Sequence, residues 1–260
     1  MSNYWQDRMS KAQDTLTQKH ADKTNKQIAK YYSDAMKNTI NSFEKTYQKI
    51  LIAVEKGETP TPADLYKLDT YWQTQAELRE ELQKLGSKQV ALMSRAFENQ
   101  YLDIYNSIAL PAGAAFSTPS KEAVNQLINA IWTADKKTWS ERIWNNTERL
   151  AETLNDELVH CVITGKKTTD LKNLLQERFR VSYDRADTLV RTEMSHLQTQ
   201  AAHKRYTDAG VKYFEVWGSE DERRCEICAG YHEKIYPIDS IPPIPAHPRC
   251  RCTILPVIED

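Results

Sequence analysis

The chain is poor in glycine, with 7 in 260 residues. All-β and α/β proteins of this length use glycine at many turns and loops, so this scarcity argues against both fold classes. Long stretches rich in Glu, Lys and Gln occupy the chain instead, and these residues favour helix. The composition therefore predicts a mostly helical protein.

The sequence also lacks a long apolar run, since no stretch of about 18 apolar residues occurs. Its first residues, MSNYWQDRMSK, lack the apolar core of a secretion signal. We therefore expect no membrane span and synthesis in the reducing cytoplasm. The formal net charge of −1 gives no overall attraction to nucleic acid or to an anionic membrane. Any DNA contact would need a local basic face.

In the N-terminal half, apolar residues recur at helical spacing. Residues 1–56 predict one amphipathic helix. The part before about residue 24 has few apolar residues and is expected to fray or to await a partner. The segment 56–62, KGETPTP, should end this helix at Gly57. A second helical stretch is predicted over 63–108, with an interruption at Gly86 and Ser87.

Further helices are predicted over residues 120–133, 137–163, 171–179 and 182–210. Ser120 is the expected N-terminal cap of the first, and Gly210 should end the last. Cys161 falls on the apolar face of the predicted helix 137–163 and is expected to be a buried core thiol.

After Gly210 the pattern changes to near alternation of β-branched and aromatic residues. Strands are predicted at 211–217, 233–238 and 251–258. Pro237 and Pro256 confine the last two strands to edges or ends of a sheet.

The expected fold class is α+β and predominantly α-helical. Long N-terminal helices precede a C-terminal helical domain that carries a small antiparallel β unit pinned by zinc. We expect a helical N-terminal region at 1–136 and a second domain at 137–260, with the zinc unit at 211–260.

The zinc prediction rests on a cluster of cysteines near the C-terminus. The pair Cys225-Glu-Ile-Cys228 precedes the sequence His247-Pro-Arg-Cys250-Arg-Cys252. A C-x-x-C turn supplies two thiolates, and a second pair completes the four ligands of a tetrahedral zinc site. Two other interpretations are reduced thiols that pack a small core and disulfides in an extracellular particle.

Five candidate ligands compete for four places. The spacing favours Cys225, Cys228, His247 and Cys250, with Cys252 as the competing ligand. Four protein ligands close the site, and a closed zinc site is structural because catalysis needs an open position for water.

Catalytic alternatives find less support in the sequence. Glu233, next to His232, lies between the two ligand pairs and would have to activate a zinc-bound water. However, the sequence has neither H-E-x-x-H nor H-x-E paired with P-C-x-x-C. Glu193 and His196 form one E-x-x-H pair, whereas di-iron bundles need two. His196 and His203 are therefore interpreted as core-edge or solvated histidines.

Arg191-Thr192-Glu193 lies inside a predicted helix. Arg191 and Glu193 are two residues apart and do not face each other, so each needs a partner elsewhere. Residues 220–224, EDERR, provide suitable charges. We expect a structural clasp of Arg191, Glu193, Asp221 and Arg223 that joins the zinc unit to the helix.

The ordered set of RTE (191–193), Trp217, DERRCEIC (221–228) and PPIPAHPRCRC (242–252) resembles the phage head morphogenesis domain of the Mu F-like minor head proteins of tailed bacteriophages. The resemblance covers roughly 140–260 and is sharpest over 184–256. Two departures are Arg224, where threonine is usual, and a slightly longer proline–histidine segment. Neither affects the candidate ligands.

The resemblance implies a virion component of the capsid interior and not an enzyme. Such proteins are low-copy minor capsid proteins that join the procapsid with the portal. The implied partners are the portal protein and the scaffolding or major capsid protein. The resemblance leaves two questions open. One is whether the protein contacts double-stranded DNA through lysines such as Lys19, Lys23, Lys26 and Lys30. The other is whether it leaves the head with that DNA.

Two rival functions come from other classes. One is a zinc-containing nuclease or toxin-like enzyme, and the other is a zinc-ribbon nucleic-acid-binding protein. One zinc per chain without hydrolysis of DNA or RNA would favour the assembly protein over the nuclease.

Overall fold

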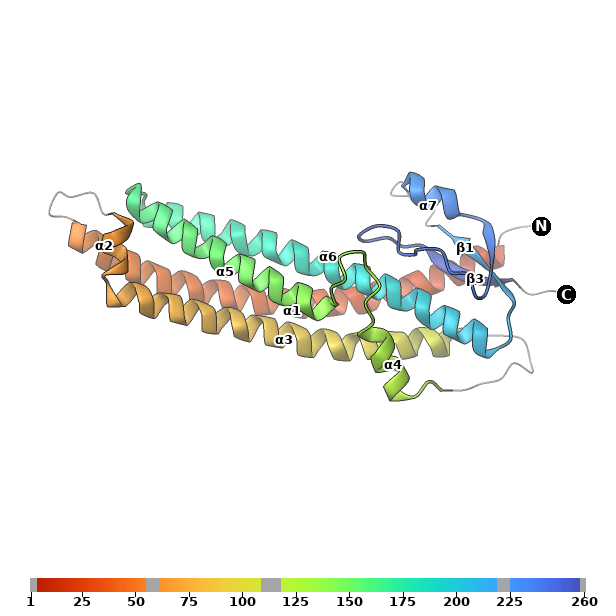
Figure 1. Ribbon diagram of the computed structural model, residues 1–260. Helices are drawn as coiled ribbons and strands as arrows, with labels where there is room; N and C mark the ends of the chain where they lie inside the picture. Colours follow the sequence, from red (N-terminus) through yellow and green to blue (C-terminus); the bar gives the residue numbers. More distant parts are fainter. Residues whose placement is uncertain (1–3, 55–60, 109–117, 219–224, 258–260) are drawn as a thin grey trace. The chain divides into compact units, whose positions relative to one another are not determined.

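A computed structural model of the chain describes residues 4–54, 61–108, 118–218 and 225–257. The elements are α1 (Tyr4–Val54), α2 (Pro62–Tyr66), α3 (Asp69–Ser107), α4 (Lys121–Ile128), α5 (Trp139–Ile163), α6 (Thr168–Asp208), β1 (Tyr213–Trp217), α7 (Glu226–Tyr231), β2 (Lys234–Pro237) and β3 (Thr253–Val257) (Figure 1). The prediction of a mostly helical protein with a small antiparallel sheet is confirmed. The helices in the described part of the chain are all too short or too polar to span a bilayer.

The chain forms two compact units that are interleaved in sequence. One contains Met1–Asn25, Leu92–Trp139 and Asp187–Asp260, and we call it the sheet unit. The other contains Lys26–Ala91 and Ser140–Ala186, and we call it the bundle unit. Helices α1, α3 and α6 contribute residues to both. The compact units therefore do not coincide with the ranges 1–136 and 137–260, and the division at 136/137 stays a prediction.

The bundle unit has an apolar core to which all of its long helices contribute. Cys161 of α5 is fully buried there, as predicted for a core thiol. The Tyr47 hydroxyl donates a hydrogen bond to the Cys161 carbonyl oxygen at 3.0 Å. Burial raises the pKa of the Cys161 thiol, so the side chain behaves as a neutral core residue.

The interruption predicted at Gly86 is wrong, because α3 runs without a break through this residue. A Cβ atom placed on Gly86 would lie 2.5 Å from Cζ3 of Trp144 on α5. The glycine is thus present for close packing of an aromatic ring, and its intrinsic preference against helix is overridden by that packing.

The close approach predicts an unusual effect of Gly86→Ala. This change ordinarily stabilises a helix interior by about 0.5–1 kcal/mol. Here we expect it to lower the free energy of unfolding by about 1–2 kcal/mol, since the new methyl group collides with the indole ring. In a Trp144→Ala background the same change should stabilise. Urea denaturation of the four proteins checks this, and a stabilising effect in both backgrounds would contradict the packing.

The break predicted between 179 and 182 is also wrong, because α6 is one continuous helix from Thr168 to Asp208. Its buried positions recur every three or four residues through Phe179, Ser182, Ala186 and Val190. Ser182 belongs to this stripe although it is polar. Its hydroxyl lies 3.2 Å from that of Tyr32. Gly210 ends the helical segment with a φ of 74°, as predicted.

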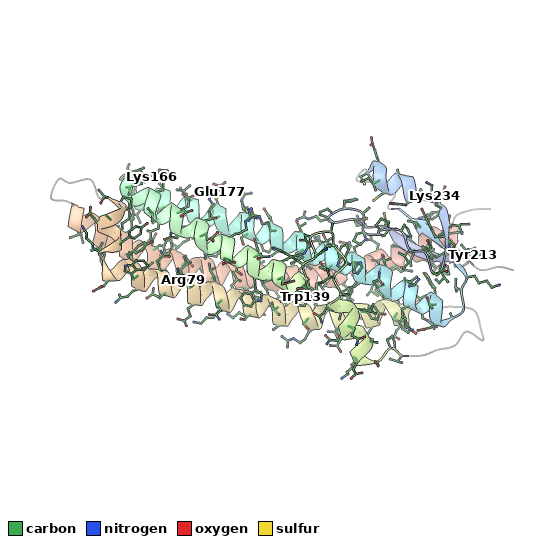
Figure 2. All side chains as sticks on the ribbon, viewed as in Figure 1. Arg79, Trp139, Lys166, Glu177, Tyr213 and Lys234 are labelled. Carbon is green, nitrogen blue, oxygen red and sulfur yellow. The ribbon has the colours of Figure 1, made fainter. Side chains whose placement is uncertain are left out.

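The sheet unit contains a three-stranded antiparallel sheet of order β2-β1-β3. Tyr213 and Lys234, the first residues of β1 and β2, are labelled in Figure 2. Pro237 and Pro256 lie on the two outer strands, which confirms the edge prediction. The Tyr206 hydroxyl of α6 donates to the Ile254 carbonyl oxygen of β3 at 3.0 Å.

The expectation that the chain frays before about residue 24 is wrong, since α1 begins at Tyr4 and packs within the sheet unit. Its buried residues there are Gln13, Thr17, Ala21, Thr24 and Asn25. Gln13 Nε2 donates to the Tyr206 hydroxyl at 3.3 Å, and Gln100 Nε2 donates to Thr17 Oγ1 at 3.2 Å. The buried stripe is polar and small, which apolar periodicity does not detect.

Candidate metal centre

The first ligand pair lies at the start of α7. Cys225 is the N-terminal cap of this helix, and its Sγ accepts a hydrogen bond from the Cys228 backbone N–H at 3.4 Å. That N–H bond lowers the pKa of the Cys225 thiol. The C-x-x-C turn therefore directs two sulfurs to the same side and favours the thiolate form of the first.

The second group comes from the segment between β2 and β3. Its backbone turns at residues 247–250, where the Cys250 N–H donates to the His247 carbonyl oxygen at 3.1 Å. The turn brings both side chains to Cys228. His247 Nε2 lies 3.2 Å from Cys228 Sγ, and Cys250 Sγ lies 3.6 Å from it.

Five candidate ligands form two overlapping groups. One is Cys225, Cys228 and His247, and the other is Cys228, Cys250 and Cys252; within each group the ligand atoms lie within 4.8 Å of one another. Cys228 belongs to both. The structure thus brings all five predicted candidates together, and which four bind one ion stays a prediction.

The second nitrogen of His247 has a partner that suits a metal ligand. His247 Nδ1 lies 2.9 Å from the Pro248 carbonyl oxygen. Because that oxygen only accepts, Nδ1 carries the proton and Nε2 keeps its lone pair. Nε2 is the atom that faces Cys228, so the neutral tautomer needed for coordination is the one the backbone selects.

The pKa values of the cysteines in the cluster shift in opposite directions. Burial raises the pKa of Cys228, whereas hydrogen bonding from Cys252 lowers the pKa of Cys250. The same contact raises the pKa of Cys252. One thiolate is thus stabilised at the expense of its neighbours, since several adjacent thiolates repel one another unless a cation lies between them.

The donor set fits a zinc ion. Thiolate sulfur and imidazole nitrogen are ligands that zinc prefers, and four of them satisfy its tetrahedral geometry. Cys228, Cys250 and Cys252 are buried, which limits access of water to the sulfurs. The cluster can therefore hold a metal ion through side chains alone.

The RTE motif lies on α6 beside this cluster, and its three side chains contact three different elements. Successive residues of a helix are about 100° apart, so each points in its own direction. Arg191 donates to Asp22 Oδ1 of α1 at 2.8 Å. Thr192 Oγ1 accepts from the Arg249 backbone N–H at 3.0 Å. Glu193 Oε2 accepts from Trp132 Nε1 at 2.9 Å.

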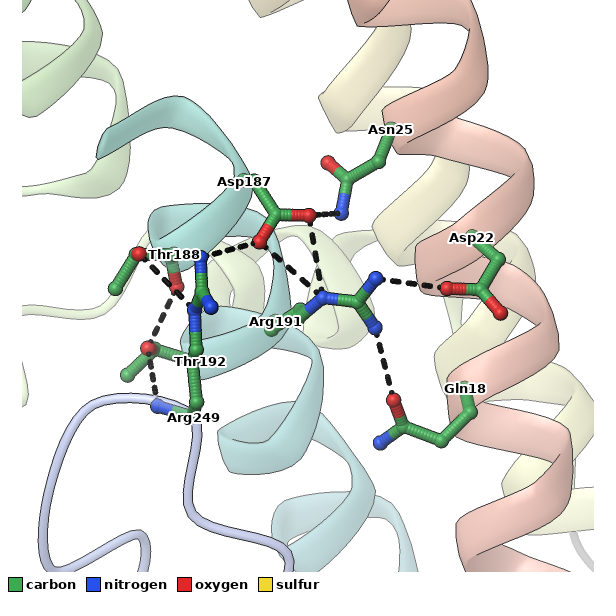
Figure 3. Close-up of polar contacts among 8 residues, drawn as sticks. All are labelled: Gln18, Asp22, Asn25, Asp187, Thr188, Arg191, Thr192 and Arg249. Atoms are coloured by element: carbon green, nitrogen blue, oxygen red, sulfur yellow. Dashed lines mark hydrogen bonds and ion pairs between the residues drawn. The ribbon is translucent and has the colours of Figure 1, made fainter. Parts of the chain in front are cut away.

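Arg191 makes further polar contacts, which Figure 3 shows. Its Nη1 donates to Gln18 Oε1 at 2.9 Å, and its Nε donates to Asp187 Oδ1 at 3.2 Å. The clasp predicted from the sequence involved Asp221 and Arg223 instead, and these two residues lie outside the described part of the chain. Their role stays a prediction, and the partners on α1 were not foreseen.

Asp187 of α6 is the common acceptor of this network. Besides Arg191, it accepts from Arg249 Nη2 and from Asn25 Nδ2, each at 2.6 Å (Figure 3). Its side chain is 14% exposed. One largely buried carboxylate therefore links α6, α1 and the turn that carries the metal ligands. Arg249 lies in that turn, between His247 and Cys250.

Arg251, between Cys250 and Cys252, forms a second link to α1. Its Nε donates to Asp14 Oδ1 at 3.1 Å, and its Nη2 also contacts Asp14 Oδ2, which makes a bidentate pair. The side chains are 33% and 17% exposed, respectively. Two residues further on, Thr253 Oγ1 donates to Ser10 Oγ at 3.1 Å.

Two histidines outside the cluster, His196 and His203, contact other parts of the structure. The ring of His196 stacks on Trp132 with centroids 4.2 Å apart, and burial lowers the pKa of His196 to about 4. His203 Nε2 contacts the Ile238 carbonyl oxygen. Glu233 is exposed, and its carboxylate lies 3.8 Å from His232 Nε2. Its role as a base is untested.

Together the fold and the cluster define a mostly helical protein whose small antiparallel sheet adjoins a Cys/His centre able to hold a metal ion. Residues 152–255 match the family described as phage Mu protein F like protein. The match covers less than half of the chain and agrees with the resemblance to the phage head morphogenesis, Mu F-like family that the motifs indicated. Neither the comparison with curated proteins nor that with solved structures finds a match.

Proposed function

We propose that the chain is a minor capsid protein of a tailed phage, a low-copy virion component that associates with the portal during head assembly. The observation that carries the proposal is the family match over residues 152–255. This range contains both the RTE motif of α6 and the Cys/His cluster. The protein acts in assembly and not in catalysis.

In this proposal the metal is structural zinc held by Cys225, Cys228, His247 and Cys250. Zinc bound by thiolates and imidazole cross-links the chain, and such sites contribute about 10–16 kcal/mol to folding. A contribution of this size matters here because the sheet consists of three short strands, which bury little area by themselves. Four protein ligands leave no position for a reactive water.

The rival nuclease function requires an open coordination position and a nearby base. Glu233 is the residue that would serve as that base. If the protein cleaved DNA and a Glu233→Ala variant lost cleavage while keeping its metal and its fold, the assembly function would be wrong. DNA contact without cleavage is compatible with the proposal, since Lys19, Lys23, Lys26 and Lys30 are all exposed on α1. Such binding would weaken steeply with salt.

Copurification tests the portal association. When the chain and the portal protein of the same phage are expressed together, we expect a tag on either one to recover both. An unrelated tagged protein of similar size is the control and should not recover the portal protein at the same salt concentration. Purified procapsids should contain the chain at far lower abundance than the major capsid protein. Equal abundance, or no recovery with the portal, would contradict the proposal.

A further inference from the structure

The segment 245–252 contains three candidate ligands and two arginines that alternate with them. Arg249 lies between His247 and Cys250, and Arg251 lies between Cys250 and Cys252. Both arginines contact elements outside the cluster, Arg249 at Asp187 and Arg251 at Asp14. Any ion that fixes the ligands therefore also fixes the positions of these two guanidinium groups.

The backbone at Arg249 indicates that the turn is held by its surroundings. Its φ is 60°, in the left-handed region that non-glycine residues rarely adopt. A residue in this conformation persists where its neighbours determine it. Its N–H is bound by Thr192 on α6, and the residues on either side of it include candidate ligands. Without an ion, one of these restraints is lost.

The surface on which the arginines act is the docking surface of α1. Residues 10–25 contact this part of the sheet unit through Ser10, Asp14, Gln18, Asp22 and Asn25. The positions are three or four residues apart, so they form one polar face of the helix. Since this face has few apolar residues, charged pairs carry more of its attachment than in an ordinary amphipathic helix.

From these contacts we infer that metal binding at the Cys/His cluster locks residues 10–25 of α1 onto α6 and the turn at 245–252. The inference deepens the proposed function, because it rests on the proposed metal site. The ion holds the turn, the turn presents Arg249 and Arg251, and these bind Asp187 and Asp14. The N-terminal part of α1 is thus attached in the metal-loaded protein and is released from this surface when the metal is removed.

Hydrogen exchange of the full chain, with and without zinc, tests the inference. We expect the backbone amides of residues 10–25 to exchange at least about tenfold faster after zinc is removed by a chelator. Residues 28–50 lie on the same helix but in the bundle unit, so their exchange should not change. They are the internal control for general unfolding.

A variant that keeps the metal but lacks the two guanidinium groups separates the attachment of residues 10–25 from the folding of the metal site. In Arg249→Gln/Arg251→Gln, we expect zinc to remain bound while residues 10–25 exchange as fast as in the metal-free protein. The matched control Lys19→Gln/Lys23→Gln removes two exposed positive charges from α1 and should leave exchange unchanged.

Three results would overturn the inference. One is a protein that binds zinc fully but shows no faster hydrogen exchange of residues 10–25, either after zinc removal or in the Arg249→Gln/Arg251→Gln variant. A second is an equal increase at 28–50, which indicates general unfolding. The third is a chain that binds no zinc, which removes the metal part of the proposed function as well. Portal association is measured separately, so a failure of the metal-dependent attachment of residues 10–25 can be distinguished from a failure of the proposed function.

Discussion

A Cys228→Ser protein is expected to lose its zinc and to unfold the region around the sheet, while the helices of the bundle unit persist. Cys228 belongs to both groups of candidate ligands, so its removal leaves only two ligands in each group. Structural zinc contributes about 10–16 kcal/mol, more than the total stability of many domains. Metal analysis and hydrogen exchange of residues 213–257 measure the two effects.

Cys161→Ser is the matched control, because it makes the same chemical change at a buried thiol of the bundle unit. It should keep one zinc per chain, with a loss of stability confined to its own surroundings. Cys252→Ser is expected to keep zinc as well, since Cys252 is the surplus ligand in the proposed assignment. Retention of zinc in Cys228→Ser together with its loss in Cys252→Ser would contradict the assigned ligands.

Asp187→Asn is expected to lower the free energy of unfolding by about 1.5–3 kcal/mol, because it removes the charge of a largely buried carboxylate that two arginines share. Both Arg191 and Arg249 lose a charged acceptor, and the new amide N–H₂ group faces donors in place of an oxygen. Urea denaturation of the zinc-loaded protein, followed by circular dichroism, measures the change.

Glu177→Gln is the matched control for Asp187→Asn. It removes one acidic charge from an exposed position of the same helix and should change stability by less than about 0.5 kcal/mol. Adding Arg249→Gln to Asp187→Asn should cost less than the sum of the single changes, since the two residues share one interaction. Additive effects, or equal effects of the two acidic substitutions, would show that Asp187 does not join these elements.

The parts of the fold that follow from local chemistry could be predicted. Gly210 ends α6 because glycine adopts the left-handed conformation without strain, and this is visible in one residue. Pro237 and Pro256 lack the N–H that a central strand needs, so the outer positions of β2 and β3 were also predictable. The five candidate ligands were found because C-x-x-C and H-x-x-C are spacings typical of paired zinc ligands.

The parts that depend on packing between distant segments could not be predicted. Gly86 is recognisable as a packing site only when Trp144, on another helix, is known to lie against it. Ser182 and the polar residues of α1 near Gln13 are buried by partners remote in sequence, so patterns of apolar residues miss them. The partners of Arg191 on α1 belong to the same category, although the acidic or amide residues at 14, 18 and 22 recur at helical spacing.

Zinc K-edge X-ray absorption of the protein tests the central claim most directly, because it counts sulfur ligands separately from lighter ligands and gives the distance of each. The account predicts four-coordinate zinc with three sulfurs at about 2.3 Å and one nitrogen at about 2.0–2.1 Å. A shell of sulfur and nitrogen without oxygen is that of a closed, structural site. A second light ligand at about 2.0–2.2 Å in addition to the imidazole, lost on adding a zinc-binding inhibitor, would reveal an open position and contradict the claim.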